Sequence, residues 1–240
     1  MDTHPRNFSS LLHERVMTLD TTDANVVRAG KLDCAALSDA LDRLSIKGQC
    51  YRIRPCDPDF RMAGRAFTVL YEAVQATPGT VGEFIDDVPP GSVIVIDNQG
   101  KDDVGTWGNI LTEAAYRRGV AGTVIDGNNR DVALCRKLGY PIYSRNTWMR
   151  TGKGRIQLKA LQVPVVIGSV TVYPGDIVVG DPDGVVVLPR AQENEILAAA
   201  EQITSNEEQL RDAVRSGMRM DEARRAFHYH DLQSPDYVKK

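Results

Sequence analysis

The chain has 240 residues, of which 42% are hydrophobic and 25% are charged, and its formal net charge at pH 7 is −3. This composition is ordinary for a globular protein, and the slightly acidic balance does not fit a protein that binds nucleic acid through a basic surface. No apolar run approaches the roughly 18 residues of a membrane span and no signal peptide is evident, so we expect a cytoplasmic protein without a membrane partner.

The four cysteines are Cys34, Cys50, Cys56 and Cys135. They form no C-x-x-C pair, and no histidine stands at a spacing typical of a zinc site. We therefore expect reduced thiols rather than a disulfide framework or a structural metal.

The N-terminal part is expected to be helical. Residues 1–30 are polar, mixed in charge and weakly periodic, which indicates an N-terminal helical arm. In residues 33–45, apolar side chains recur at i, i+3 and i+4 after Asp33, a good N-cap, so a short amphipathic helix is predicted there. Residues 64–74 are typical of a strand.

A regular alternation of strands and helices follows. The expected order is a strand in 89–97, a helix in 107–119, a strand in 120–127, a helix in 131–139 and a strand in 140–145. Both helices end at a glycine, as C-terminal caps commonly do. Connections this short predict right-handed βαβ units with three parallel strands in one sheet.

The last third of the chain has a different sequence pattern. Residues 163–189 contain β-branched runs broken by proline and glycine turns, which predicts antiparallel hairpins. A long amphipathic helix follows, with Ser205 and Asn206 marking a point where it could break. We expect one α/β domain in residues 31–190 with helical arms in residues 1–30 and 191–240. Arms that cannot bury their apolar stripe on a small domain often bury it on a neighbouring subunit, so we expect a homo-oligomer.

The loops that leave the carboxyl ends of parallel strands gather at one edge of a sheet, where ligands bind. Residues 97–109 and 126–131 are two such loops, and each leads into a helix whose first N–H groups attract anions. Arg130 adds a guanidinium suited to carboxylates, and Asp131 adds an oxygen ligand suited to Mg²⁺ or Mn²⁺. Alternatively, Asp131 is only a helix cap and Arg130 only a surface ion-pair partner, with Asn128 and Asn129 serving as turn formers.

Several motifs in fixed order resemble a known family. These are RGVAG (118–122), DG-x-x-RD (126–131), PGD (174–176) and D-x-DGVVVLP (181–189). Over about residues 33–200 the chain is similar to the RraA-like family, which includes class II pyruvate aldolases acting on 4-hydroxy-4-methyl-2-oxoglutarate and 4-carboxy-4-hydroxy-2-oxoadipate, and protein inhibitors of ribonuclease E. The resemblance implies a swivelling β/β/α-type fold assembled as trimers or hexamers, with active sites between subunits.

The resemblance also implies roles for individual residues. Arg130 matches the catalytic arginine that contacts substrate and stabilises oxyanion charge, and Asp131 matches the aspartate that holds the divalent metal. The stretch Gly108, Asn109, Ile110 and Leu111 matches the helix start whose N–H groups receive the pyruvyl carboxylate. Many members have an acidic residue where Asn109 stands, and small or apolar residues where Asn128 and Asn129 stand, so these amides could instead contact a more hydroxylated substrate.

The expected function is divalent-metal-dependent retro-aldol cleavage of a 4-hydroxy-2-oxo acid to pyruvate, with decarboxylation of oxaloacetate as a side activity. The alternative is a non-catalytic regulatory or binding protein with the same fold. No histidine is placed to act as general base, which leaves a water held by the metal, or Asp102 or Asp103. Arg145 either binds a distal carboxylate or forms a structural ion pair, and residues 151–155 are expected to form a basic loop over the crevice.

Overall fold

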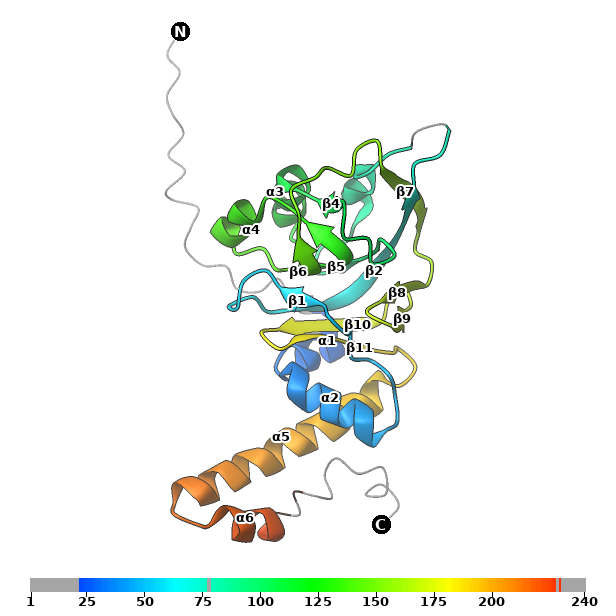
Figure 1. Ribbon diagram of the computed structural model, residues 1–240. Coiled ribbons are helices and arrows are strands. Elements are labelled where there is room, and N and C mark those ends of the chain that lie inside the picture. Colours follow the sequence, from blue (N-terminus) through cyan, green and yellow to red (C-terminus); the bar gives the residue numbers. More distant parts are fainter. Residues whose placement is uncertain (1–21, 77–78, 228, 230–240) are drawn as a thin grey trace.

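The computed structural model describes residues 22–76, 79–227 and 229 (Figure 1). All four histidines, His4, His13, His228 and His230, lie outside these ranges. Within the described residues, no helix is both long enough and apolar enough to cross a membrane.

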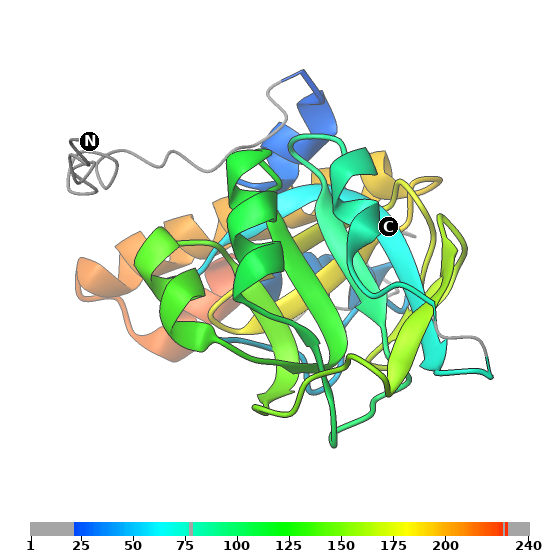
Figure 2. The same ribbon diagram turned by 90° about the horizontal axis from the view of Figure 1, so that it is seen from above.

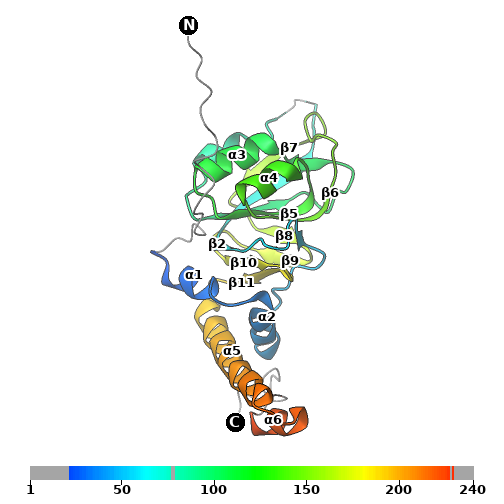
Figure 3. The same ribbon diagram turned by 90° about the vertical axis from the view of Figure 1, so that its left-hand side faces the viewer.

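Four parallel strands form the centre of the sheet, in the order β6, β5, β3, β2. They are β2 (Met62–Ala73), β3 (Val93–Asp97), β5 (Gly122–Asn129) and β6 (Ile142–Thr147). Helix α3 (Asn109–Arg117) connects β3 to β5, and α4 (Val132–Leu138) connects β5 to β6, both on the same face of the sheet (Figures 2 and 3). The predicted βαβ units are thereby confirmed.

The antiparallel part of the sheet is formed by strands that pair with the long strand β2. The first half of β2 pairs with β10, which forms a hairpin with β11, while the second half of β2 pairs with β7. Short strands β1 and β4 pair with β6 and β5, and the separate hairpin of β8 and β9 covers the face opposite α3 and α4. The bounds of these strands are β1 (Arg54–Pro55), β4 (Gly105–Trp107), β7 (Ile156–Leu161), β8 (Val165–Ile167), β9 (Val170–Val172), β10 (Ile177–Asp181) and β11 (Gly184–Leu188). The predicted α/β class with an antiparallel C-terminal portion is confirmed.

Two hydrophobic cores lie on opposite sides of β2 and β10. The larger one fills the space between the mixed sheet, α3 and α4, and includes Ile94, Ile96 and Ile125, each at most 1% exposed. The smaller one lies between the hairpin of β10 and β11 and three helices (Figure 1). Those helices are α1 (Ala24–Ala29), α2 (Cys34–Arg43) and α5 (Glu193–Arg215). The predicted amphipathic helix is α2, and the Asp33 carboxylate caps it by accepting the N–H of Ala36.

The described parts of the two arms pack on their own domain. Val26 and Ala29 of α1 and Ile196 of α5 are fully buried within one chain. Helix α5 continues through Ser205 and Asn206 without a break, because Ile203 and Leu210 bury its apolar face on both sides of this point. It then turns back into α6 (Met220–Ala226) (Figure 1). The apolar stripes of the arms therefore do not by themselves require a neighbouring subunit.

Two local expectations were wrong. Strand β5 does not end at Gly127 but continues through Asn129, because β4 and β6 pair with its last residues on either side. Helix α3 begins at Asn109 rather than Trp107, since Trp107 belongs to β4 and is buried against Tyr140. These pairings join residues distant in the chain, and local periodicity does not report them.

Candidate active site

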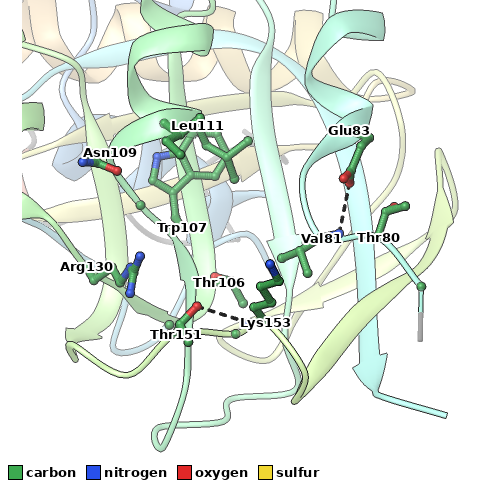
Figure 4. A pocket seen from close by; sticks show the side chains of 15 residues that line it. Thr80, Val81, Glu83, Thr106, Trp107, Asn109, Leu111, Arg130, Thr151 and Lys153 are labelled. Atoms are coloured by element: carbon green, nitrogen blue, oxygen red, sulfur yellow. Dashed lines mark hydrogen bonds between the residues drawn. The ribbon is translucent and has the colours of Figure 1, made fainter. Parts of the chain in front are cut away.

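A cavity of about 340 Å³ opens where β4 and β5 end and α3 begins (Figure 4). A volume of this size suits a small organic ligand. The residues that line it are Gly79, Thr80, Val81, Glu83, Gly105, Thr106, Trp107, Gly108, Asn109, Ile110, Leu111, Arg130, Thr151, Gly152 and Lys153. Five residues predicted for the site are among them, namely Gly108, Asn109, Ile110, Leu111 and Arg130.

The start of α3 presents unpaired donors to this cavity. Gly108 is the N-cap and has no side chain with which to cap the first turn. Thr112 N–H bonds back to the Gly108 carbonyl, and Asn109 N–H donates to Asp131, but the N–H groups of Ile110 and Leu111 precede the first intrahelical bond. A helix start with these two free N–H groups and its partial positive charge is suited to a carboxylate.

Asp131 is the N-cap residue of α4, but its side chain makes no capping bond to that helix. Its Oδ2 instead accepts the Asn109 N–H at 2.9 Å and lies 3.4 Å from Arg130 Nε. The backbone of Asp131 is left-handed, with φ of 60°, which turns the carboxylate from α4 towards α3. Asp131 therefore joins the end of β5 to the start of α3 beside the cavity, although it is not among the residues that line it.

Arg130 is anchored through its backbone while its guanidinium remains accessible. Its N–H donates to the Trp107 carbonyl at 3.0 Å, which ties the end of β5 to β4. The side chain is 36% exposed, and within the described residues its guanidinium makes only two long polar contacts, one to Asp131 and one, at 3.5 Å, to the Met149 carbonyl. The guanidinium therefore keeps donors available for an anion.

Gly108 allows these groups to come together. A Cβ at this position would lie 2.9 Å from Asp131 Oδ2 and 3.2 Å from Arg130 Nε, both too close for an undisturbed side chain. The absence of a side chain at residue 108 thus opens the helix start and lets the Arg130–Asp131 pair lie against it.

The opposite wall contains residues that the sequence did not single out for binding. Glu83, in the short helix η2 (Glu83–Asp87), accepts N–H groups from Val81 and Gly82, and these backbone bonds lower its pKa, so it is ionised. Lys153 also lines the cavity, and no ion pair of its ammonium group is found within the described ranges. The basic character of residues 151–155 was a usable signal for Lys153, whereas nothing local marked Glu83.

Other polar residues near the sheet edge lie outside this cavity. Asn128 and Asn129 are at most 1% exposed and face neighbouring strands and loops: Asn128 donates to the Asp102 carbonyl and Asn129 accepts from Ser144. They are neither turn formers nor lining residues of the cavity. Asp102 and Asp103 also do not line it. Arg145 forms an ion pair with Asp126, which confirms the structural ion pair that was one of the two roles predicted for it.

Beside the cavity, Asp131 has a carboxylate at the position that the family resemblance gives to the metal ligand. No group of three or more His, Cys, Asp or Glu side chains is arranged for a metal ion in the described part of the chain. Asp131 is 35% exposed, and its Oδ1 has no partner there. A single accessible carboxylate oxygen fits Mg²⁺ or Mn²⁺, which commonly keep several waters, and does not fit a closed structural zinc site.

Comparison with known proteins identifies relatives of the whole α/β domain. The model of the RraA-like family, described as Aldolase/RraA, matches residues 34–187. A protein of Halalkalibacterium halodurans named "Putative 4-hydroxy-4-methyl-2-oxoglutarate aldolase" is 33% identical over 178 residues, which cover 74% of this chain and 82% of that protein. Protein DlpA of Legionella pneumophila is 34% identical over 227 residues, 93% of this chain. The chain spans only 37% of the length of DlpA.

A solved structure shows the same fold. Streptomyces coelicolor RraAS2, described as an unusual member of the RNase ES inhibitor RraA protein family, superposes with a TM-score of 0.72 at 30% identity. The match covers 79% of this chain and 96% of that one. The similarity therefore includes the sheet and helices that build the cavity.

Proposed function

The chain belongs to the RraA-like (Aldolase/RraA) family, and from that premise we propose that it is a divalent-metal-dependent class II pyruvate aldolase. The proposed reaction is cleavage of a 4-hydroxy-2-oxo acid with release of pyruvate. The observation that supports it most directly is the position of Arg130 and the start of α3 at one cavity, with the Asp131 carboxylate beside it in contact with both.

The cavity suggests how such a substrate would bind. Its 1-carboxylate would accept the N–H groups of Ile110 and Leu111, and the guanidinium of Arg130 would lie beside the 2-keto oxygen. Lys153 on the opposite wall offers a second cation, which suits a substrate with a distal carboxylate. Thr151 between them offers a hydroxyl group to the middle of the substrate (Figure 4).

In the proposed reaction, the C4 hydroxyl loses its proton and the C3–C4 bond breaks. The electron pair moves onto the keto oxygen of the departing pyruvate enolate, which then takes up a proton at C3. Arg130 would stabilise the negative charge at that oxygen, a contribution that typically changes the rate by about 10²–10³-fold. Loss of CO₂ from oxaloacetate leaves the same enolate, so we propose oxaloacetate decarboxylation as a side activity.

Asp131 would hold the Mg²⁺ or Mn²⁺ ion through its free Oδ1. The bound ion would supply a Lewis acid for the 2-oxo acid. The family resemblance gives a carboxylate at the position of Asn109. The amide there would offer this ion fewer charged oxygens, so affinity for the ion would depend more on Asp131.

We further propose a cytoplasmic homo-oligomer, a trimer or hexamer with its active sites between subunits. Ile110 is 81% exposed and Met149 is 71% exposed beside the cavity, and such apolar side chains at a site rim are suited to a subunit interface. The four cysteines are free thiols, three of them buried, which fits a reducing compartment. No nucleic acid or membrane is proposed as a partner.

The test measures pyruvate release from 4-hydroxy-4-methyl-2-oxoglutarate and from oxaloacetate, with Mg²⁺ and after EDTA. We expect turnover that EDTA abolishes and added Mg²⁺ restores, and that Asp131→Asn abolishes. Asp33→Asn is the matched control, because Asp33 also caps a helix but lies on α2, away from the cavity. Turnover that survives both EDTA and Asp131→Asn would exclude the proposal.

The second candidate is a non-catalytic regulator, and the similarity to Streptomyces coelicolor RraAS2 favours it. The two candidates differ in whether substrate-like ligands stabilise the protein, because any ligand that binds only the folded state must raise its stability. An aldolase should gain about 2.7 kcal/mol when oxalate with Mg²⁺ is present at 100 times its Kd. A thermal midpoint unchanged by millimolar Mg²⁺ with pyruvate or oxalate would favour the regulator.

A further inference from the structure

A second and larger cavity, of about 760 Å³, lies between α2, residues 49–54 and the hairpin of β10 and β11. It shares no lining residue with the cavity at Arg130. The residues that line it are Cys34, Ala35, Ser38, Gln49, Cys50, Tyr51, Arg52, Ile53, Arg54, Arg145, Asp183, Gly184, Val185 and Val186. This volume accommodates an organic ligand larger than a 2-oxo acid.

Three arginines distinguish the lining of this cavity. Arg52 and Arg54 are exposed, and neither guanidinium has a hydrogen-bond or ion-pair partner within the described residues. The Arg145 guanidinium is held through Nε by the carboxylate of Asp126, which is itself 4% exposed and accepts the N–H of Gly168 at 2.8 Å. The Arg145 guanidinium is thus fixed in place, whereas those of Arg52 and Arg54 have no carboxylate partner within the described residues.

The backbone that carries Arg52 and Arg54 is itself anchored. Cys50 N–H donates to the Val185 carbonyl at 3.0 Å, and Tyr51 N–H donates to the Gly168 carbonyl at 3.0 Å. Between these anchors and β1, Arg52 adopts a left-handed conformation with φ of 65°, which is unfavourable for a residue with a Cβ. The segment therefore holds its arginine in a strained position at the cavity rather than in a relaxed turn.

The remaining lining adds little negative charge. Asp183 is the one carboxylate among the described lining residues, and Asp126 balances the charge of Arg145. Arg52 and Arg54 against Asp183 therefore leave a net charge of +1. Burial raises the pKa of the Cys50 thiol to about 12, and burial likewise raises the pKa of Cys34, so both thiols are neutral. At the start of α2, Asp181 accepts the N–H of Cys34 and Asp33 accepts the N–H of Ala36, so these donors are not available to a ligand.

We propose that this cavity is a binding site for a small organic polyanion with at least two carboxylate or phosphate groups. The planar guanidinium fork binds either group through paired N–H donors, and Arg52 and Arg54 have theirs unused. The Asp183 carboxylate at the same cavity offers hydrogen-bond acceptors for hydroxyl groups of such a ligand. The site is separate from the proposed catalytic cavity and does not depend on its chemistry.

The experiment is isothermal titration of the full chain, in Mg²⁺ and at constant ionic strength, with two probes. Tricarballylate represents polycarboxylates and fructose 1,6-bisphosphate represents phosphorylated compounds. We expect one probe to bind in the micromolar range, and Arg52→Ala with Arg54→Ala to weaken it by about 100-fold. Arg130→Ala and the exposed-surface variant Arg117→Ala should leave this affinity unchanged.

Three results would overturn the proposal. The first is no binding of either probe below millimolar concentration. The second is equal binding by the wild type and the double variant, or loss of binding in Arg130→Ala. The third is a double variant whose molar mass by light scattering differs from that of the wild type, which would assign these arginines to a subunit interface. A circular dichroism melt at the wild-type midpoint verifies that the double variant is folded.

Discussion

Two arginines, Arg65 and Arg130, each lie beside an aspartate in this molecule, and the two pairs differ in how completely they are satisfied. Arg65 Nε lies 2.8 Å from Asp23 Oδ2, and its Nη2 lies 3.0 Å from Glu193 Oε1. Arg130 Nε lies 3.4 Å from Asp131 Oδ2 and has one further contact at 3.5 Å. The first guanidinium is saturated within its own chain, whereas the second is not.

The surroundings differ in the same way. The Arg65 side chain is 21% exposed and joins β2 to α1 and α5, and its hydrogen bond lowers the pKa of Asp23. The Arg130 side chain is 36% exposed at the mouth of a cavity. The number of close carboxylate partners and the burial of the side chains, rather than the residue types, therefore separate a pair that stabilises the fold from a pair available to a ligand.

The largest expected effect is on catalysis. Arg130→Ala should lower kcat/KM for the proposed substrate by about 10²–10³-fold, equal to about 3–4 kcal/mol, because it removes the positive charge at the developing oxyanion. The free energy of unfolding should change by less than about 0.5 kcal/mol, since the side chain has only long contacts. Arg117→Ala, which removes an exposed pair with Glu113, is the control for both measurements.

If Arg130→Ala instead unfolds at a much lower urea concentration than the wild type, the pair at the cavity is structural after all. Full activity in this variant would equally remove the distinction between the two arginines.

The next effect is on stability. Arg65→Ala should lower the free energy of unfolding by about 3 kcal/mol, because it leaves the largely buried carboxylates of Asp23 and Glu193 without their cation. Activity at a temperature where the variant is folded should equal that of the wild type. Urea unfolding followed by circular dichroism measures the first quantity and a steady-state assay the second.

Arg28→Ala is the matched control for this change, because Arg28 also connects α1 to α5, through Glu201, but on the exposed surface. It should cost less than about 1 kcal/mol. Equal costs for the two variants would contradict the importance of burial in the comparison.

A smaller effect is expected at the helix start. Gly108→Ala should lower kcat/KM by about tenfold, because the added Cβ would displace the Asp131 carboxylate and the Arg130 side chain from their present positions. The backbone at residue 108 has φ of −147°, which alanine adopts without strain, so stability should hardly change. Wild-type kinetics in this variant would show that the close approach to Gly108 has no functional role.

The smallest effect concerns pH. Burial acts to raise the pKa of Glu193, but hydrogen bonds from Arg65 and Asn25 outweigh it, and the pKa values of both Glu193 and Asp23 lie below their usual range. Their stabilising contribution is therefore present above the unfolded-state pKa of about 4 and is lost as the pH falls through the folded-state values. The wild type should lose urea resistance more steeply than Arg65→Ala between pH 6 and pH 3, and parallel curves would contradict this.

Local sequence predicted much of the scaffold. The spacing of apolar residues after Asp33 predicted α2, and the glycines after Arg118 and Leu138 marked the ends of α3 and α4. Apolar runs with short connections predicted the parallel strands that bring Arg130 and the start of α3 to one edge of the sheet. These signals are local, because helix periodicity and caps depend on neighbours within a few residues.

The details of the site could not be predicted in this way. Asp131 stands at the start of its own helix, as expected, but its carboxylate accepts the N–H of Asn109 in α3, which lies 22 residues earlier in the chain. Asn128 and Asn129 were expected in a turn, but they belong to β5 because β4 and β6 pair with them. Glu83 reaches the cavity from a short helix that no motif marked.

By itself, the sequence determined the class of fold, the order of its strands and helices, and the presence of Arg130 and Asp131 at the carboxyl edge of the sheet. The tertiary structure alone decided which guanidinium groups have close carboxylate partners. Arg65 pairs with carboxylates from two distant helices and Arg145 pairs with a buried aspartate, whereas Arg130 has only a long contact to Asp131. The physical reason is that the strength of a charge pair depends on distance and burial, and both are fixed only when segments far apart in the chain pack together.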